Sequence, residues 1–118
     1  MEHGVVRILM PTYRPGGLKA RIYPHWCRSP TFTLVSLRDG YEVKVFERRK
    51  VTPLDLVKGE GVNVIIACSL SIKALEELGT LGVKVYSACD VTVEEAIGMY
   101  RGLRLPRVSV VKVLDEGA

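Results

Sequence analysis

The stretch from Gly61 to Gly102, GVNVIIACSLSIKALEELGTLGVKVYSACDVTVEEAIGMYRG, decides the fold that we expect for this chain of 118 residues. Within it, Val62–Ala67 is a β-branched run typical of a strand that is covered on both faces. Val83–Tyr86 predicts a second strand. A helix between two such strands makes a right-handed crossover, so we expect the strands to be parallel and close together.

Two helices are predicted from their capping residues and apolar spacing. The first begins after a capping serine, Ser69 or Ser71, and its apolar residues recur at every third position. The second begins after Thr92, has Glu95 three residues on in a capping-box pattern, and stops at Gly102.

The N-terminal half predicts one strand and a hairpin. Val5–Met10 is a short apolar run ended by Pro11, which indicates a mostly buried strand. Thr31–Leu37 and Tyr41–Glu47 are rich in β-branched and aromatic residues, as strands are. Asp39-Gly40 between them suits the left-handed angles of a tight turn.

Two shorter segments complete the pattern. Pro53–Lys58 could form barely two helical turns, and Arg107–Leu114 has enough valine for a last strand with a frayed end. The order predicts an α/β fold with a mixed sheet, in which a hairpin is followed by a parallel strand–helix–strand–helix unit. We expect one domain over residues 1–118, with residues 107–118 as a tail that could form an edge strand.

Composition limits the classes of function. The formal net charge is +4, and the basic residues form three groups in which no run exceeds three residues, so we expect a solvated surface and no nucleic-acid binding. No run is apolar for long enough to span a membrane, and residues 1–4 lack a signal-peptide pattern, so we expect a cytoplasmic protein. Glutamine is absent and Asn63 is the single asparagine, which indicates a thermophilic source.

The motifs of common hydrolases are missing, with no GxSxG, Walker phosphate loop or HExxH in the chain. The carboxylates are scattered, and Val5–Met10 supplies none of the acids that a two-metal nuclease projects from its central strands. We therefore expect a ligand-binding protein and not an enzyme.

Cysteines and a histidine are the candidate ligand-binding residues. Cys68 follows one predicted parallel strand and Cys89 lies three residues beyond the next, at the carboxyl ends where open α/β sheets bind ligands. His25 and Cys27 lie in a loop that could fold over the same rim. Three thiols and an imidazole suit zinc, iron or an iron–sulfur cluster, and Arg28 could lower a thiol pKa or pair with an anionic ligand.

Other states of the cysteines stay open. Cys68 could simply continue the apolar strand, because cysteine often behaves as a small buried hydrophobe. Cys68 and Cys89 could also form a disulfide, since intracellular disulfides occur in hyperthermophiles. The spacing of the three cysteines matches no standard metal motif.

The chain resembles the dinitrogenase iron–molybdenum cofactor biosynthesis family, which groups the NifX-like proteins and the C-terminal domain of NifB-like proteins. Three stretches carry the resemblance: Arg7–Thr12 (RILMPT), Pro24–Phe32 (PHWCRSPTF) and above all Gly61–Gly102. The likeness extends to about Pro106 and is that of an archaeal-type, stand-alone member.

The resemblance implies a ribonuclease H-like, three-layer α/β fold without nuclease activity. It also implies binding or carriage of an iron–sulfur-based metallocluster or an iron–molybdenum-type cofactor precursor, together with a protein partner in cofactor assembly. The family's proline–histidine loop is a ligand-contacting element, and it maps to His25. Many archaeal members come from organisms without evident nitrogen fixation, so a role in nitrogenase assembly is not assumed.

The chain departs from the family pattern at its cysteines and in one segment. Cys27 stands where relatives usually have glycine, and Cys68 and Cys89 stand where relatives tend to have small residues. The segment Arg48–Lys58 is shorter than usual and lacks a His-Gly-Gly-rich stretch. The cysteines could compensate as thiolate ligands or could mark a different ligand.

Two hypotheses of function follow. The first is a carrier of a metallocluster or small anionic ligand, with metal ligands His25, Cys27, Cys68 and Cys89 and with Arg28 as a further cofactor-binding residue. The second is a scaffold or regulatory module with structural cysteines, which binds a protein partner or a second copy through an edge strand at Val108–Val113.

Overall fold

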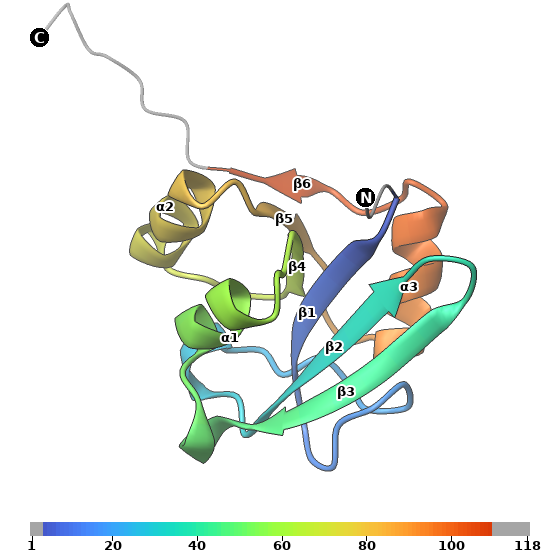
Figure 1. Cartoon of the computed structure of the whole chain (residues 1–118), viewed down its shortest axis with the longest axis horizontal. Helices are drawn as coiled ribbons and strands as arrows, with labels where there is room; N and C mark the ends of the chain where they lie inside the picture. The colour runs from blue at the N-terminus through green and yellow to red at the C-terminus, as the bar shows by residue number, and fades with distance from the viewer. Residues whose placement is uncertain (1–3, 110–118) are drawn as a thin grey trace, which may run out of the picture.

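The computed structural model describes residues 4–109 and has a six-stranded mixed sheet with helices on both faces (Figure 1). The strands are β1 (Val6–Thr12), β2 (Thr31–Leu37), β3 (Tyr41–Glu47), β4 (Val64–Ala67), β5 (Lys84–Ser87) and β6 (Arg107–Val108). The helices are α1 (Pro53–Gly59), α2 (Ile72–Thr80) and α3 (Val93–Arg101), with short 3-10 turns η1 (Trp26–Arg28) and η2 (Arg48–Lys50). The predicted α/β fold with a mixed sheet is confirmed.

The strand order in the sheet is β3-β2-β1-β4-β5-β6. β2 is antiparallel to β1 and β3, whereas β4 is parallel to both of its neighbours, β1 and β5. β6 returns antiparallel to β5 at the edge. The predicted crossover is confirmed, because α2 connects the adjacent parallel strands β4 and β5. Their carboxyl ends therefore lie side by side.

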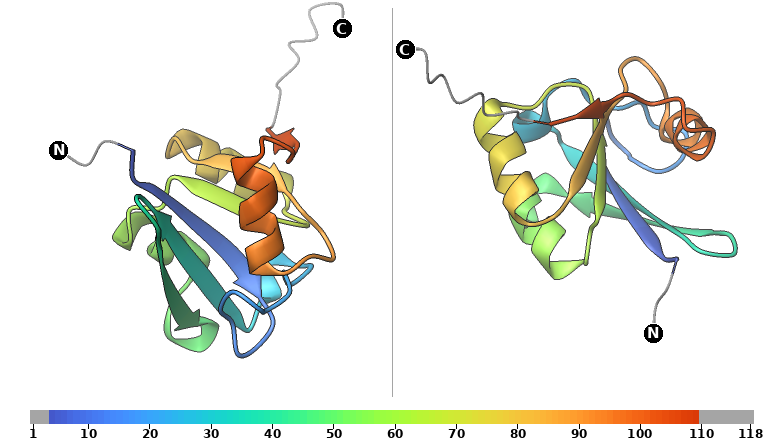
Figure 2. Two further views of the ribbon diagram at one scale, coloured as in Figure 1. Left: turned by 90° about the vertical axis from the view of Figure 1, so that its right-hand side faces the viewer. Right: turned by 90° about the horizontal axis from the view of Figure 1, so that it is seen from above.

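The core consists of two clusters of side chains, one on each face of the sheet. Figure 2 shows α1 and α2 on one face and α3 on the other. Leu9 of β1 belongs to the cluster with α1 and α2, whereas its neighbours Ile8 and Met10 belong to the cluster with α3. Successive residues of a strand point to opposite faces, so a strand that is covered on both sides is apolar throughout. Val64–Ala67 of β4 is buried at every position for this reason.

Capping side chains fix the starts of α2 and α3. Ser71, one of the two serines expected, accepts a hydrogen bond from Ala74 N–H at 3.1 Å. Thr92 and Glu95 form the predicted capping box: Thr92 Oγ1 accepts from Glu95 N–H at 3.1 Å, and Glu95 Oε1 accepts from Thr92 N–H at 2.8 Å. Within residues 4–109, no helix is both long and apolar enough to cross a membrane.

The capping box predicts a pH dependence of stability. Hydrogen bonds from the backbone N–H and the side chain of Thr92 hold the pKa of Glu95 below its ordinary value of 4.5. A carboxylate whose pKa is lowered by folding adds stability above its unfolded pKa, and that stability is lost as the pH falls through the folded pKa. We expect Glu95→Gln to lose less stability than the wild type between about pH 6 and about pH 3 in urea titrations. Parallel pH profiles for the two proteins would contradict this expectation.

The prediction that the first strand ends at Pro11 is wrong, because β1 continues through Pro11 to Thr12. Pro11 pairs with Phe32 of β2, while its carbonyl accepts from Tyr23 N–H on the opposite side at 2.8 Å. The N–H and carbonyl of one strand residue point to the same side, so the N–H that proline lacks is not needed for the β1–β2 ladder. Proline therefore interrupts no strand pairing here.

Two further predictions are corrected or fall outside the structure. The predicted hairpin forms with a connection of three residues, Arg38–Gly40, but neither Asp39 nor Gly40 has the predicted positive φ. Arg38 N–H donates to the Gly40 carbonyl at 3.0 Å within it. The last strand is described only over Arg107–Val108, and residues 110–114 of the predicted strand lie outside the described residues.

Candidate functional site

The carboxyl ends of β4 and β5 carry two of the three cysteines. The parallel pairing ends at Ala67↔Ser87, and Ala88 N–H then donates to the Ala67 carbonyl at 3.1 Å. This arrangement brings Cys68 and Cys89 together, and they form a disulfide with their Cα atoms 4.8 Å apart. Of the cysteine states that the sequence leaves open, the structure holds the disulfide.

A segment that we call the strap, residues 21–28, crosses this edge of the sheet. Its first end is fixed to the loop after β5, where Ile22 N–H donates to the Val91 carbonyl at 2.9 Å. The Arg21 guanidinium donates to the Asp90 carbonyl in the same loop, also at 2.9 Å. Asp90 has a left-handed φ of 59°, which suits the sharp turn of the chain at this point.

The other end of the strap is fixed to the loop after β4, where Trp26 N–H donates to the Ser69 carbonyl at 3.2 Å. Between the two ends, Tyr23 N–H donates to the Pro11 carbonyl of β1 at 2.8 Å. These bonds tie the strap to the carboxyl ends of β1, β4 and β5. It therefore runs along the edge of the sheet at which the Cys68–Cys89 disulfide lies.

Trp26 anchors the strap in the core. Its side chain is only 6% exposed, and its ring meets Phe32 edge-on with the ring centroids 5.5 Å apart. Because η1 buries Trp26, the side chains on either side of it are left on the surface: His25, Cys27 and Arg28 are all exposed. The strap thus presents an imidazole, a thiol and a guanidinium to solvent at the carboxyl-end edge of the sheet.

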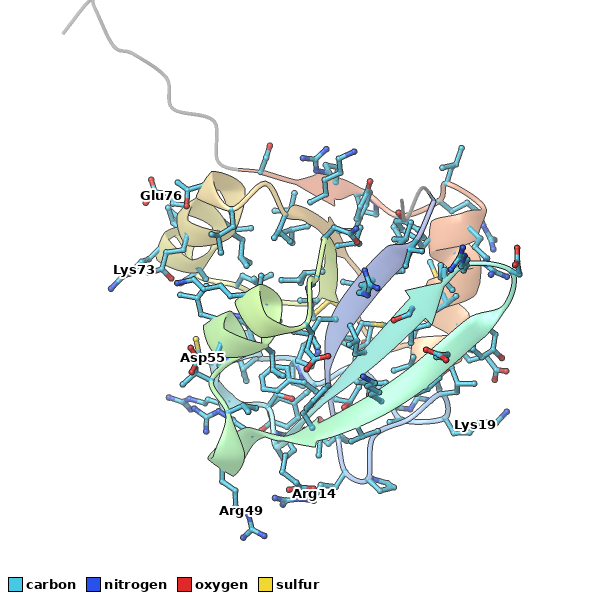
Figure 3. The ribbon with its side chains drawn as sticks, in the orientation of Figure 1. Arg14, Lys19, Arg49, Asp55, Lys73 and Glu76 are labelled. Atoms are coloured by element: carbon cyan, nitrogen blue, oxygen red, sulfur yellow. A yellow bond between two sulfur atoms is a disulfide. The ribbon has the colours of Figure 1, made fainter. Side chains whose placement is uncertain are left out.

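Two hollows flank Cys27. One, of about 320 Å³, lies between the strap and Ser69–Ser71. The other, of about 290 Å³, lies between Cys27 and the first residues of α1 and α2, beside Lys73, whose side chain extends outward from α2 (Figure 3). A larger hollow of about 640 Å³ lies between α2 and β6, but no sulfur or imidazole group lines it.

The structure gathers the five candidate residues at one edge but does not form a metal centre from them. Among residues 4–109, no group of three or more His, Cys, Asp and Glu side chains is placed to hold a metal ion. The sulfur atoms of Cys68 and Cys89 are joined, and the thiolate is the form of cysteine that binds metals. A centre with His25, Cys27, Cys68 and Cys89 as ligands stays a prediction, and it requires reduction of the disulfide.

Several basic side chains near the strap have partners within the protein. Arg14 pairs with Glu47 at 3.1 Å, and Lys19 pairs with Glu94 at 3.0 Å, a hydrogen bond that raises the Lys19 pKa. Figure 3 shows Arg14, Lys19 and Arg49 extending away from the ribbon. Exposed ion pairs of this kind contribute little stability. Arg14, Lys19 and Arg49 are all exposed and belong to the solvated surface that the composition suggests.

Comparison with known proteins identifies the family. The family model described as dinitrogenase iron-molybdenum cofactor matches residues 7–102. The chain belongs to this family. The resemblance that the sequence predicted is thereby confirmed. None of the curated proteins that were compared matches the chain.

Three solved structures are similar to the chain of this family member. A Thermotoga protein described as a NifB protein is 25% identical, with a TM-score of 0.75, and the match covers 92% of this chain and 97% of that one. The apo form of the orange protein from Desulfovibrio gigas has a TM-score of 0.76 at 19% identity, covering 86% and 92%. A Methanocaldococcus jannaschii protein described as a dinitrogenase has a TM-score of 0.74 at 19% identity, covering 87% and 94%. The last two show likeness of fold.

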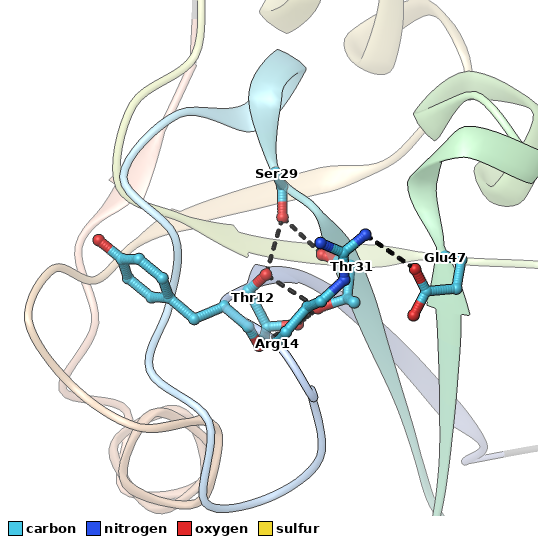
Figure 4. A network of polar contacts seen from close by, with 6 residues as sticks. Thr12, Arg14, Ser29, Thr31 and Glu47 are labelled. Carbon is cyan, nitrogen blue, oxygen red and sulfur yellow. Dashed lines mark hydrogen bonds and ion pairs between the residues drawn. The ribbon is translucent and has the colours of Figure 1, made fainter.

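A group of buried hydroxyls, which the sequence did not predict, lies next to the C-terminal end of the strap in this family member (Figure 4). Thr12 Oγ1 lies 2.7 Å from Thr31 Oγ1 and 3.0 Å from Thr33 Oγ1. Ser29 Oγ donates to the carbonyls of Thr12 and Thr31. All four residues are fully buried, and every buried polar side-chain atom of the described residues has a partner. The network joins the end of the strap to β1 and β2.

Alkylation should report the state of each cysteine in this family member. Cys27 is free and exposed, whereas Cys68 and Cys89 are joined. We expect iodoacetamide to modify one cysteine of the unfolded, unreduced protein and all three after reduction, as counted by mass spectrometry. Peptide mapping should place the single adduct on Cys27. Three adducts without reductant would contradict the disulfide.

Proposed function

We propose that this family member binds and carries an iron–sulfur-based metallocluster, or a precursor of one, and catalyses no reaction on it. The strap is the observation that carries the proposal. Its anchors at Val91 and Ser69 bring His25 and Cys27 to the edge where Cys68 and Cys89 lie. The family is named after the iron–molybdenum cofactor, which supports a cargo of this chemical class.

The side chains at this edge suit a cargo that must be released again. Thiolate sulfur and imidazole nitrogen are the usual protein ligands of iron–sulfur centres, and here Cys27 and His25 would supply them. Arg28 would balance part of the negative charge of an anionic cluster. All three side chains are exposed, so an acceptor protein could reach the cargo without unfolding of the carrier.

The fold supports a carrier rather than a nuclease. The order β3-β2-β1-β4-β5, with β2 as the reversed strand among these five, supports the assignment to ribonuclease H-like folds. The central strand β1, VRILMPT, contains no carboxylate, whereas a two-metal nuclease projects acids from its central strands. We therefore assign this member a binding role in cofactor handling.

Anaerobic reconstitution tests the proposal. The reduced, full-length protein is incubated with iron and sulfide and desalted, and its iron, sulfide and visible spectrum are measured. We expect iron and sulfide in a fixed ratio to protein, with charge-transfer absorption. A Cys27→Ser/Cys68→Ser/Cys89→Ser variant should retain neither.

Arg28→Ala tests whether a positive charge near the cargo helps to retain it. Arg49→Ala on η2 is the matched control for the overall charge of the protein. The two variants carry the same net charge, and both arginines are exposed. We expect faster loss of iron to a chelator from Arg28→Ala alone. A colourless, iron-free wild type would contradict carriage, and full retention by the triple cysteine variant would contradict the assigned ligands.

The position of β6 favours a second candidate, a scaffold that binds a protein partner. β6 lies at the edge of the sheet, and the chain continues beyond it as Val110, Val111, Lys112 and Val113. An extended segment at a sheet edge can pair with another chain. In this case, a chain that ends at Ser109 should lose the self-association of the full chain in sedimentation experiments, and cysteine replacements should leave that association unchanged.

A further inference from the structure

We propose that Cys68 and Cys89 form a redox-gated dithiol site for thiophilic metal. As a disulfide the pair offers no thiolate, and after reduction it supplies two neighbouring thiolates to the cargo at the strap. The inference rests on the proposed function and adds a regulation to that site. Electron transfer, and not only the concentration of metal, then decides whether the protein is loaded.

Backbone contacts hold the two cysteines together without help from the disulfide. On one side, β4 and β5 pair up to Ala67↔Ser87, and Ala88 N–H continues the contact to the Ala67 carbonyl. On the other side, the strap is bonded to Val91 and Ser69, in the same loops as the cysteines. Reduction therefore leaves two thiols in a preorganised position, and a preorganised site binds metal with a smaller loss of conformational entropy.

The disulfide is open to a reductant from one side. Cys89 is exposed, whereas Cys68 is partly buried and packs against the cluster of side chains under α3. A thiolate that attacks a disulfide needs access to one sulfur atom, and the Cys89 sulfur belongs to the more accessible residue. Cys68 would then be the leaving thiolate.

The chemical step needs a dithiol as reductant. Its first thiolate attacks Cys89 Sγ, the bond to Cys68 Sγ breaks, and Cys68 leaves as a thiolate that takes up a proton. The second thiol of the reductant then displaces Cys89, so the reductant becomes a disulfide and the protein gains two electrons and two protons in total. When a metal ion binds, these two protons are released again.

Reduction changes the number of donors at the edge. The oxidised protein offers the Cys27 thiol and the His25 imidazole, and a closed tetrahedral site needs four ligands. The reduced protein adds the two neighbouring thiols of Cys68 and Cys89, which together can give a metal ion two thiolate ligands. Thiolate sulfur is an ordinary ligand of zinc and of its tetrahedral substitute, cobalt.

Titration with Co²⁺ alone tests the gate on the full-length wild type, anaerobically, in three states: oxidised, reduced and desalted, and reoxidised. We expect cobalt–thiolate charge-transfer absorption and proton release in the reduced state only. Affinity in the oxidised state should be at least about 100-fold lower, because losing one outer-shell partner alone costs 10–100-fold. Reoxidation by a small-molecule disulfide should release the cobalt.

Variants locate the gate. Cys68→Ser/Cys89→Ser should bind cobalt weakly whatever the redox state, whereas Cys27→Ser should bind less tightly than wild type but keep its dependence on reduction. Circular dichroism checks that each variant is folded, and the comparison of wild-type states needs no variant.

Equal cobalt affinity in the oxidised and reduced wild type, or no cobalt binding by either, would overturn the gate. If the gate fails, retention of iron and sulfide by the reduced protein would still support the proposed carriage of a cluster. Cobalt binding that depends on reduction, without retention of iron, would support the gate and contradict the carriage of a cluster.

Discussion

Replacing Cys68 and Cys89 with serine lowers the free energy of unfolding by about 3 kcal/mol, because the disulfide closes a long loop in the unfolded chain. The two cysteines are 21 residues apart in sequence, and a crosslink over such a distance reduces the conformational entropy of the unfolded state. Urea denaturation measures the change. The dependence of unfolding free energy on urea should also become steeper, because the unfolded variant is less compact.

Two comparisons make this prediction specific. Cys27→Ser, which removes the exposed free thiol, should change stability by less than about 0.5 kcal/mol. Reduction of the wild type should reproduce the effect of the double variant. Domains of this size are usually stable by about 5–15 kcal/mol, so the reduced protein should remain folded, as the redox gate requires. Equal stability of oxidised and reduced wild type would show that the crosslink does not constrain the unfolded chain.

Thr31→Val should lower the free energy of unfolding by about 2 kcal/mol, because it removes a hydroxyl from the fully buried network. Thr31 Oγ1 donates to the Thr12 carbonyl at 2.9 Å and lies 2.7 Å from Thr12 Oγ1. Valine has nearly the same shape as threonine but offers no partner to these atoms. Thermal and urea unfolding would both report the loss.

Thr80→Val is the matched control for Thr31→Val. Thr80 Oγ1 donates to the Glu77 carbonyl at 2.7 Å, but this residue lies on the exposed end of α2, where water can replace the lost bond. The control should cost less than about 0.5 kcal/mol. Because Ser29 joins the network directly after the strap, Thr31→Val should also speed the release of iron from a loaded protein. Equal costs for the two valine variants would contradict a structural role of the network.

The second half of the fold could be predicted because its signals are local. The capping box of Thr92 and Glu95, the cap at Ser71 and the β-branched run of β4 each depend on neighbours within a few residues. The two wrong predictions concern strand ends and turns. Pro11 was expected to end the strand because proline lacks an N–H. Whether that N–H is needed depends on which side of β1 it would face, and this is seen only from the hydrogen bond between the Pro11 carbonyl and Tyr23 N–H of the strap.

The positions of Cys68 and Cys89 could be predicted from the sequence, but the bond between them could not. The position of Cys68 and Cys89 at the carboxyl ends of parallel strands follows from the order of elements, and the structure puts them there. Whether they ligate, pack or crosslink depends on the 4.8 Å separation of their Cα atoms and on redox conditions, which no local pattern contains. The hydroxyl network around Thr12 was missed because threonine and serine are mostly surface residues.

Amide NMR spectra of the protein, recorded before and after anaerobic loading with iron and sulfide, test the central claim most directly. A paramagnetic cluster broadens the amide signals close to it. We predict that loss of signal centres on the strap, residues 21–28, and on residues 68–71 and 88–91, which the structure brings to one edge of the sheet. Broadening centred on β3 or on the hollow between α2 and β6, or an unchanged spectrum from a protein that retains no iron, would contradict the account.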